Sequence, residues 1–76
     1  MKQHVRESVR QRFREFGIEH VRRARPIDPT EEVFLISPSD AARIDTSEMA
    51  IALYDLIPHT KIWVIAEDSA WEAEDL

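Results

Sequence analysis

Two short apolar runs, residues 31–37 (EEVFLIS) and residues 61–66 (KIWVIA), constrain the fold of this chain more than any other feature. Each run has the length of a β-strand and is rich in β-branched and aromatic residues. Consecutive positions are apolar in both runs, so each strand has two apolar faces, which is typical of parallel strands that are buried on both sides. The sequence therefore predicts a sheet that must be covered on both faces.

The segment between the two runs carries helix signals. Ser37 is a candidate N-cap, with Pro38 at the first helical position and Asp40 at the third. A second cap at residues 45–47 precedes a predicted helix over residues 47–57. The inward positions of this helix are Met49, Ala50, Leu53 and Ile57. A strand, a helix and a strand in this order predict a parallel βαβ unit with a right-handed crossover.

The N-terminal segment predicts a further helix. Apolar residues recur every three or four positions over residues 2–16, and Gly17, the only glycine, follows where a helix C-terminus favours positive φ. Residues 18–25 fit either a second helical stretch or a strand. We favour the strand, because Gly17 and Pro26 bracket a length that is typical of one.

The chain has 76 residues and no cysteine, so we expect a single domain, residues 1–76, without disulfides. A core in a domain below about 70–80 residues is thin and usually needs a disulfide, a metal or a partner subunit. We therefore predict a homodimer of a small α/β (α+β) domain of order α-(β)-β-α-β, with a two- to three-stranded sheet packed by two helices. Its parts are a basic N-terminal helix segment (residues 1–25), the βαβ unit (residues 31–66) and an acidic tail (residues 67–76).

The two faces of this sheet need separate covers. The crossover helix covers one face, and either the N-terminal helix or a second subunit covers the other. Aromatic and aliphatic strand residues are the natural anchors of such a subunit contact. The expected interface residues are Trp63, Phe34, Ile36 and Ile65.

Charge is distributed unevenly along the chain, whose formal net charge is −5. Residues 1–25 hold eight Lys and Arg against three Glu, whereas residues 26–76 hold two Lys and Arg against twelve acidic residues. This asymmetry indicates either different partners for the two parts or a contact between them. Five of the acids lie in residues 67–76, so we expect that tail to be exposed and its removal to leave the fold largely intact.

The N-terminal arginines are candidate phosphate-binding residues, because guanidinium groups pair well with phosphate. The leading hypothesis is a non-enzymatic regulatory or accessory protein that contacts nucleic acid through residues 1–25. Net acidity counts against it, because such binding depends mainly on phosphate neutralisation. Simple solvation of the arginines and docking of the helix onto the acidic remainder are the structural alternatives. The candidate nucleic-acid-binding residues are Arg6, Arg10, Arg14, Arg22, Arg23 and Arg25.

The main alternative function is a protein-binding module or inhibitor whose acidic residues 26–76 dock onto a basic partner protein. A small hydrolase ranks a distant third, and we predict no catalytic residues. The residue types of a hydrolytic triad are present, but the glycine-flanked turn that exposes a nucleophile is absent. These residues are Ser37, Ser39, Asp40 and His59.

The sequence predicts no metal, cofactor or membrane contact. His4, His20 and His59 lack metal-ligand spacing, and one glycine is too few for a phosphate cradle. No apolar run approaches the ~18 residues that span a membrane. The N-terminus also lacks the apolar core of a secretory signal, so we expect a cytoplasmic protein.

Overall fold

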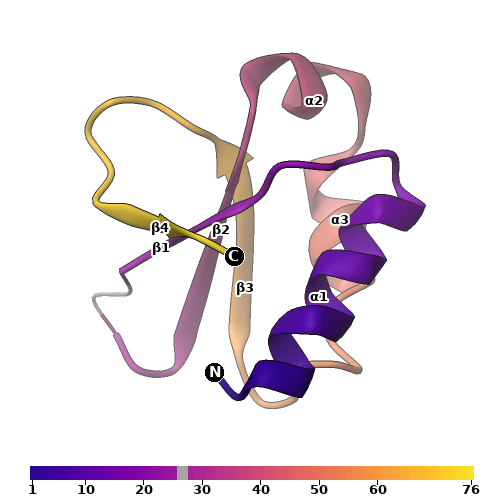
Figure 1. Ribbon diagram of the computed structural model, residues 1–76, viewed down its shortest axis with the longest axis vertical. Coiled ribbons are helices and arrows are strands. Elements are labelled where there is room, and N and C mark those ends of the chain that lie inside the picture. Colours follow the sequence, from indigo (N-terminus) through magenta and orange to yellow (C-terminus); the bar gives the residue numbers. More distant parts are fainter. Residues whose placement is uncertain (26–27) are drawn as a thin grey trace.

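The structure, a computed structural model, describes residues 1–25 and 28–76 and shows a small mixed α+β domain. A four-stranded sheet has the order β3-β2-β1-β4, and three helices pack against it (Figure 1). The elements are α1 (Gln3–Glu15), β1 (Arg22–Ala24), β2 (Glu31–Ile36), α2 (Pro38–Arg43), α3 (Thr46–Ile51), β3 (Lys61–Ala66) and β4 (Ala73–Asp75). No helix in these described ranges is long and apolar enough to cross a membrane.

The two apolar runs form neighbouring parallel strands. β2 and β3 pair in a register that runs from Glu31 opposite Lys61 to Ile36 opposite Ala66. β1 lies antiparallel to β2 on its other side, and β4 lies antiparallel to β1. The parallel pair is therefore the strand pairing that the sequence predicts, but the sheet has more strands than the two or three expected.

The crossover between β2 and β3 contains two short helices instead of one long helix. Ser37 caps α2 by accepting a hydrogen bond from the Asp40 amide at 3.1 Å, as predicted. Asp45 caps α3 by accepting hydrogen bonds from the amides of Ser47 and Glu48. The predicted helix over residues 47–57 ends early at Ile51. Beyond it, Leu53 donates its amide to Ala50, three residues back, and this tighter winding turns its side chain into the core.

The N-terminal helix ends where its glycine predicts. Gly17 has φ 78°, and Ile18 donates its amide to the Phe13 carbonyl in a Schellman-type closure. A Cβ on this glycine would lie 3.3 Å from Nη1 of Arg43, which donates to the Phe16 carbonyl. Of residues 18–25, only Arg22–Ala24 form a strand. Pro26, expected to end that strand, lies outside the described residues.

Most residues of the acidic tail are exposed, as expected, but its end is tied to the sheet. Residues 73–75 form β4, and Leu76 is only 8 % exposed because its side chain joins the main core. The Leu76 amide also donates to the Val21 carbonyl at 3.1 Å. Pairing with β1 satisfies the backbone of this acidic segment, so its composition does not prevent it from being ordered.

All the helical core residues lie on one face of the sheet, which corrects the expectation that the N-terminal helix covers the face opposite the crossover. Phe13 of α1 meets Phe34 of β2 edge to face, with ring centroids 5.6 Å apart. Met49 of α3 joins the same cluster. Figure 1 shows the helices on one side of the sheet and the segment between β3 and β4 on the other. The second face is therefore left without a helix.

Candidate protein-binding surface

The sheet face opposite the helices, here called the open face, has an apolar centre. Because paired residues of adjacent strands point to the same side, Val33 lies beside Trp63 and Leu35 lies beside Ile65. Trp71, in the segment between β3 and β4, packs against this cluster. The apolar residues of the open face are Ala24, Val33, Leu35, Trp63, Ile65, Trp71 and Ala73.

A groove crosses this face. It has a volume of about 300 Å³, and Val33, Trp63, Ile65 and Trp71 form most of its lining. The side chain of Trp63 is 47 % exposed, although it sits in the middle of a strand. Trp71 and Ile65 are half-buried. A large aromatic left uncovered at a groove is typical of a binding surface, because burial against a partner is strongly favourable.

Acidic side chains without an ion-pair partner in the described residues lie on the two chain segments that contribute to the groove, and one of them, Glu31, lines it. They lie in the turn that leads into β2 and in the segment after β3, at Asp28, Glu31, Asp68 and Glu72. The amide and hydroxyl of Thr30 donate to Asp28 at 2.8 and 2.7 Å and hold the pKa of this carboxyl below its usual value. Lys61, whose Nζ lies 5.8 Å from the Trp63 ring centroid, and Arg25 are the cations at the rim. The two segments that contribute to the groove are therefore acidic on balance, although Glu31 and Arg25 in its lining carry opposite charges.

Three of the six predicted nucleic-acid contacts are engaged by acids of residues 26–76. Arg23 donates to both carboxylate oxygens of Glu32 at 2.8 Å, in a part-buried bidentate pair. Arg22 pairs with Glu67 and also donates to the Ala73 carbonyl. Arg6 reaches from α1 to Glu74, at 3.5 Å, and to the Asp75 carbonyl. Much of the basic N-terminal segment is thus bound to the acidic remainder, which was one of the structural alternatives.

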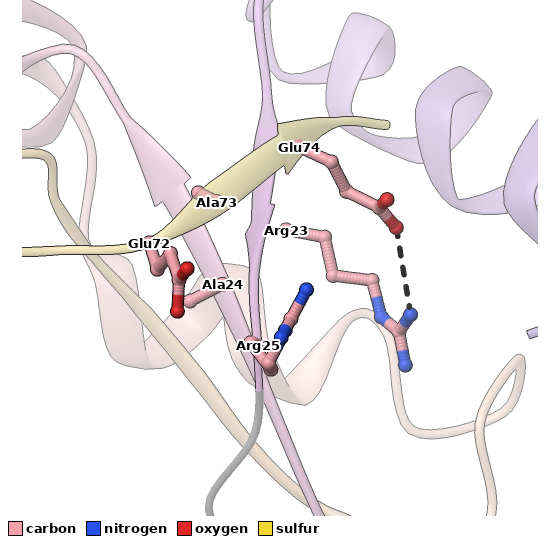
Figure 2. Close-up of a pocket in the computed structure, with 6 residues that line it drawn as sticks. All are labelled: Arg23, Ala24, Arg25, Glu72, Ala73 and Glu74. Carbon is pink, nitrogen blue, oxygen red and sulfur yellow. Dashed lines mark ion pairs between the residues drawn. The ribbon is translucent and has the colours of Figure 1, made fainter.

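A shallow pocket of about 160 Å³ lies where β1 meets β4. Figure 2 shows its lining residues, with the Arg23 guanidinium turned toward Glu74 in an ion pair of 3.8 Å. Arg25 has no ion-pair partner within the described residues, although its amide bonds the Glu72 carbonyl at 3.0 Å. Because Glu72 and Glu74 balance the formal charge of the two arginines that line this pocket, it is a poor receptor for phosphate.

Arg10 and Arg14 remain on the surface of α1, with only local partners. Arg10 pairs with Glu7 at 3.2 Å, and Arg14 lies 3.8 Å from Glu19. Both arginine side chains are more than two-fifths exposed, so each ion pair contributes little. Arg12, which the sequence did not single out, instead ties α1 to Asp55 at 2.9 Å and to the Ala52 carbonyl.

The predicted interface residues divide between the two faces. Trp63 and Ile65 lie on the open face, whereas Phe34 and Ile36 are fully buried beneath the helices and have no surface to offer a second chain. Strand alternation explains the division, because neighbouring residues point to opposite sides. The sequence left open whether Trp71 folds back over the domain or docks into a partner, and it did not place Trp71 among the interface residues. Its distance of eight residues from Trp63 in the sequence carries no local signal for their meeting in the groove.

The Ser, Asp and His residues that could form a hydrolytic triad have structural roles in this fold. Ser37 is the cap of α2, its hydroxyl lies 3.2 Å from that of Ser39, and Asp40 bonds Arg43 at 2.9 Å. His59 has φ 60° in the turn before β3. In the ranges that the structure describes, no three His, Asp or Glu side chains group as metal ligands.

Comparison of the chain with protein-family models, with curated proteins and with solved structures finds no match. The function of this chain is therefore inferred from the geometry of its open face.

Proposed function

We propose that this protein is a small, non-enzymatic protein-interaction module whose open face binds a basic segment of a partner protein. The observation that carries the proposal is Trp63, half exposed at an apolar groove on the sheet face that no helix covers. Tryptophan is the residue most enriched among binding hot spots, where a central anchor supplies most of the affinity.

Charge favours a basic partner. Glu31 lines the groove, and Asp28, Asp68 and Glu72 lie on the segments that contribute to it, all without ion-pair partners in the described residues. The arginines of β1 are engaged by other acids. A cationic segment would gain from these carboxylates both in its rate of encounter and in its register. Its apolar side chains would fill the space between Trp63 and Trp71. The ligand we propose therefore alternates Lys or Arg with aliphatic or aromatic residues.

Nucleic-acid binding is the second candidate, and one observation favours it. Arg10 and Arg14 are exposed one turn apart on α1, and their glutamate partners are exposed as well. This hypothesis now depends on fewer free arginines than the sequence suggested, because Arg6, Arg22 and Arg23 are held by the chain's own acids and carbonyls.

Selection from a displayed library of short peptides tests the first candidate. Peptides are selected on the wild-type protein and then measured against Trp63→Ala and against a control, Ile51→Ser, which removes a more exposed apolar side chain from the helical side. We expect basic, apolar peptides whose affinity falls about thirtyfold in Trp63→Ala and is unchanged in Ile51→Ser. Peptides that bind both variants equally, or a selection that yields none, would refute the proposal.

Titration with duplex DNA at low and moderate salt separates the two candidates. Binding that weakens when Arg10 and Arg14 are both replaced by Gln, with a smaller salt dependence, would support the nucleic-acid hypothesis. The same replacement should leave peptide binding to the open face unchanged, because both arginines lie on α1, on the helical side.

A further inference from the structure

The outer edge of β3 carries backbone groups that the domain does not use. β3 lies at the end of the sheet, with β2 as its neighbour. Lys61 donates its amide to the Thr30 carbonyl at 2.9 Å and Glu67 donates to the Ile36 carbonyl at 2.8 Å, so the odd-numbered residues of β3 bond β2. Backbone groups alternate sides along a strand. The residues whose amides and carbonyls point away from the sheet are therefore Ile62, Val64 and Ala66.

The two edges of the sheet differ in how they discourage pairing. β4 is three residues long and carries Glu74 and Asp75, features that protect an edge. β3 is six residues long, and its four central residues are all apolar. It has neither a proline nor a central charge, so it is a ready template for another strand.

We propose that β3 pairs antiparallel with β3 of a second copy of this chain, in a two-fold symmetric register centred on Val64. The two four-stranded sheets would then form one continuous sheet, with a closed, self-complementary interface. This inference does not require the proposed partner-binding function, because the pairing uses the backbone edge of β3, although Trp63 and Ile65 contribute side chains to both the groove and the pairing.

Backbone geometry permits this register. Val64 stands opposite Val64 of the second copy, and Ile62 stands opposite Ala66. All of these residues turn their backbone groups outward, so each opposed pair can exchange two hydrogen bonds. A shift by one residue in one strand would oppose an outward-facing group to an inward-facing one and break the ladder.

Side chains select this register from the other symmetric ones. Centring on Val64 sets Trp63 opposite Ile65 of the second copy, an aromatic and β-branched pair, and sets Lys61 opposite Glu67, a pair of opposite charges. Glu67 uses Oε1 for Arg22, and the other carboxylate oxygen remains available to the lysine. Centring on Trp63 would oppose Lys61 to Ile65, and centring on Ile65 would oppose Trp63 to Glu67. Neither places opposite charges together.

A proline on the open edge tests the interface. Ala66→Pro removes an outward-facing amide without touching a bond to β2, and Ala66 is exposed, so the core is unaffected. Ala66→Ser is the matched control. Sedimentation equilibrium should give about twice the 8.9 kDa chain mass for wild type and Ala66→Ser, and the chain mass for Ala66→Pro. A monomeric wild type, or dimerisation of Ala66→Pro equal to that of Ala66→Ser, would overturn the proposal.

Charge reversal tests the register. Lys61→Glu alone and Glu67→Lys alone each create two like-charged pairs per dimer, so we expect each dissociation constant to rise about tenfold. An equimolar mixture of the two variants restores both attractive pairs and should form a heterodimer of near wild-type affinity. A variant that has lost its fold cannot recover on mixing, so recovery also controls for folding. If the mixture dimerises no more tightly than either variant alone, this register is refuted.

Discussion

The two faces of the sheet use neighbouring residues of the same strands in different ways. In β2, Phe34 and Ile36 point beneath the helices and are completely buried, and in β3 Ile62 and Val64 join them. One position away, Trp63 is 47 % exposed on the open face. Both strands carry apolar residues on both faces, yet only the first face is covered by helices. An apolar pattern thus identifies a surface to be covered, but it does not say whether the chain itself or another molecule covers it.

The largest expected effect comes from removing residues 73–76, which contribute to both faces. The deletion removes β4, the partner of β1, together with the buried Leu76 and the carbonyl and carboxylate that hold Arg6. A domain of this size has a total stability of about 4–11 kcal/mol, so the combined loss should abolish cooperative thermal unfolding. Circular dichroism melting measures it. The double variant Glu74→Gln/Asp75→Asn, which keeps the strand, should still unfold cooperatively.

On the helix-covered face, Phe34→Ala should lower the free energy of unfolding by about 3–5 kcal/mol, because it leaves a cavity beneath Phe13 and Met49. Urea denaturation followed by far-UV circular dichroism gives the value. A loss of less than about 1 kcal/mol in the free energy of unfolding would mean that the helices move toward the sheet and fill the cavity.

Acid should weaken the attachment of the helical layer. Arg12 hydrogen bonds hold the pKa of Asp55 below its usual value, and Arg43 lowers the pKa of Asp40 in the same way. A lowered folded-state pKa stabilises the fold above the unfolded pKa of about 4, and this contribution is lost as pH falls through the folded pKa. Melting temperature should therefore fall below about pH 4, and less steeply in Asp55→Asn. If the Arg12–Asp55 ion pair is the cause, Arg12→Gln should reduce the pH dependence of the melting temperature to the same extent.

The smallest effect on stability is expected for Trp63→Ala, on the open face. A half-exposed side chain loses little burial on truncation, so the free energy of unfolding should fall by less than about 1.5 kcal/mol. The same denaturation experiment as for Phe34→Ala measures it. A loss as large as that of Phe34→Ala would erase the contrast between the faces and assign Trp63 to the folding core.

Elements with strong local signals were predictable from the sequence. The strands of the βαβ unit, the cap of α2 at Ser37 and the stop at Gly17 each depend on a few adjacent residues. A serine at an N-cap accepts a hydrogen bond from an amide of the first helical turn, which has no partner within the helix, and a glycine takes positive φ at low cost. Such features need no knowledge of the rest of the chain.

Features that depend on distant partners were missed or left open. β4 is three residues long, largely acidic, and becomes a strand only because β1 offers it a ladder. The side of the sheet on which α1 lies is decided by the fit of Phe13 against Phe34. Arg22 of the N-terminal segment pairs with Glu67, which lies more than forty residues later in the chain. Composition reports that both charges exist, but not that they meet.

The pairing of β1 with β4 also has a consequence for the order in which the chain folds. Arg22 lies opposite Asp75, so this ladder closes a long loop, whereas β2, α3 and β3 are neighbours along the chain. Closing a long loop costs entropy before any contact compensates for it, so distant pairings tend to form late. We therefore expect Leu76→Ala to accelerate unfolding much more than it slows refolding, which the two arms of a chevron plot would separate. If refolding slows by the larger factor, β4 is already docked in the transition state. If unfolding accelerates by the larger factor, β4 docks after the transition state of folding, and the rate at which it detaches sets the lifetime of the native protein.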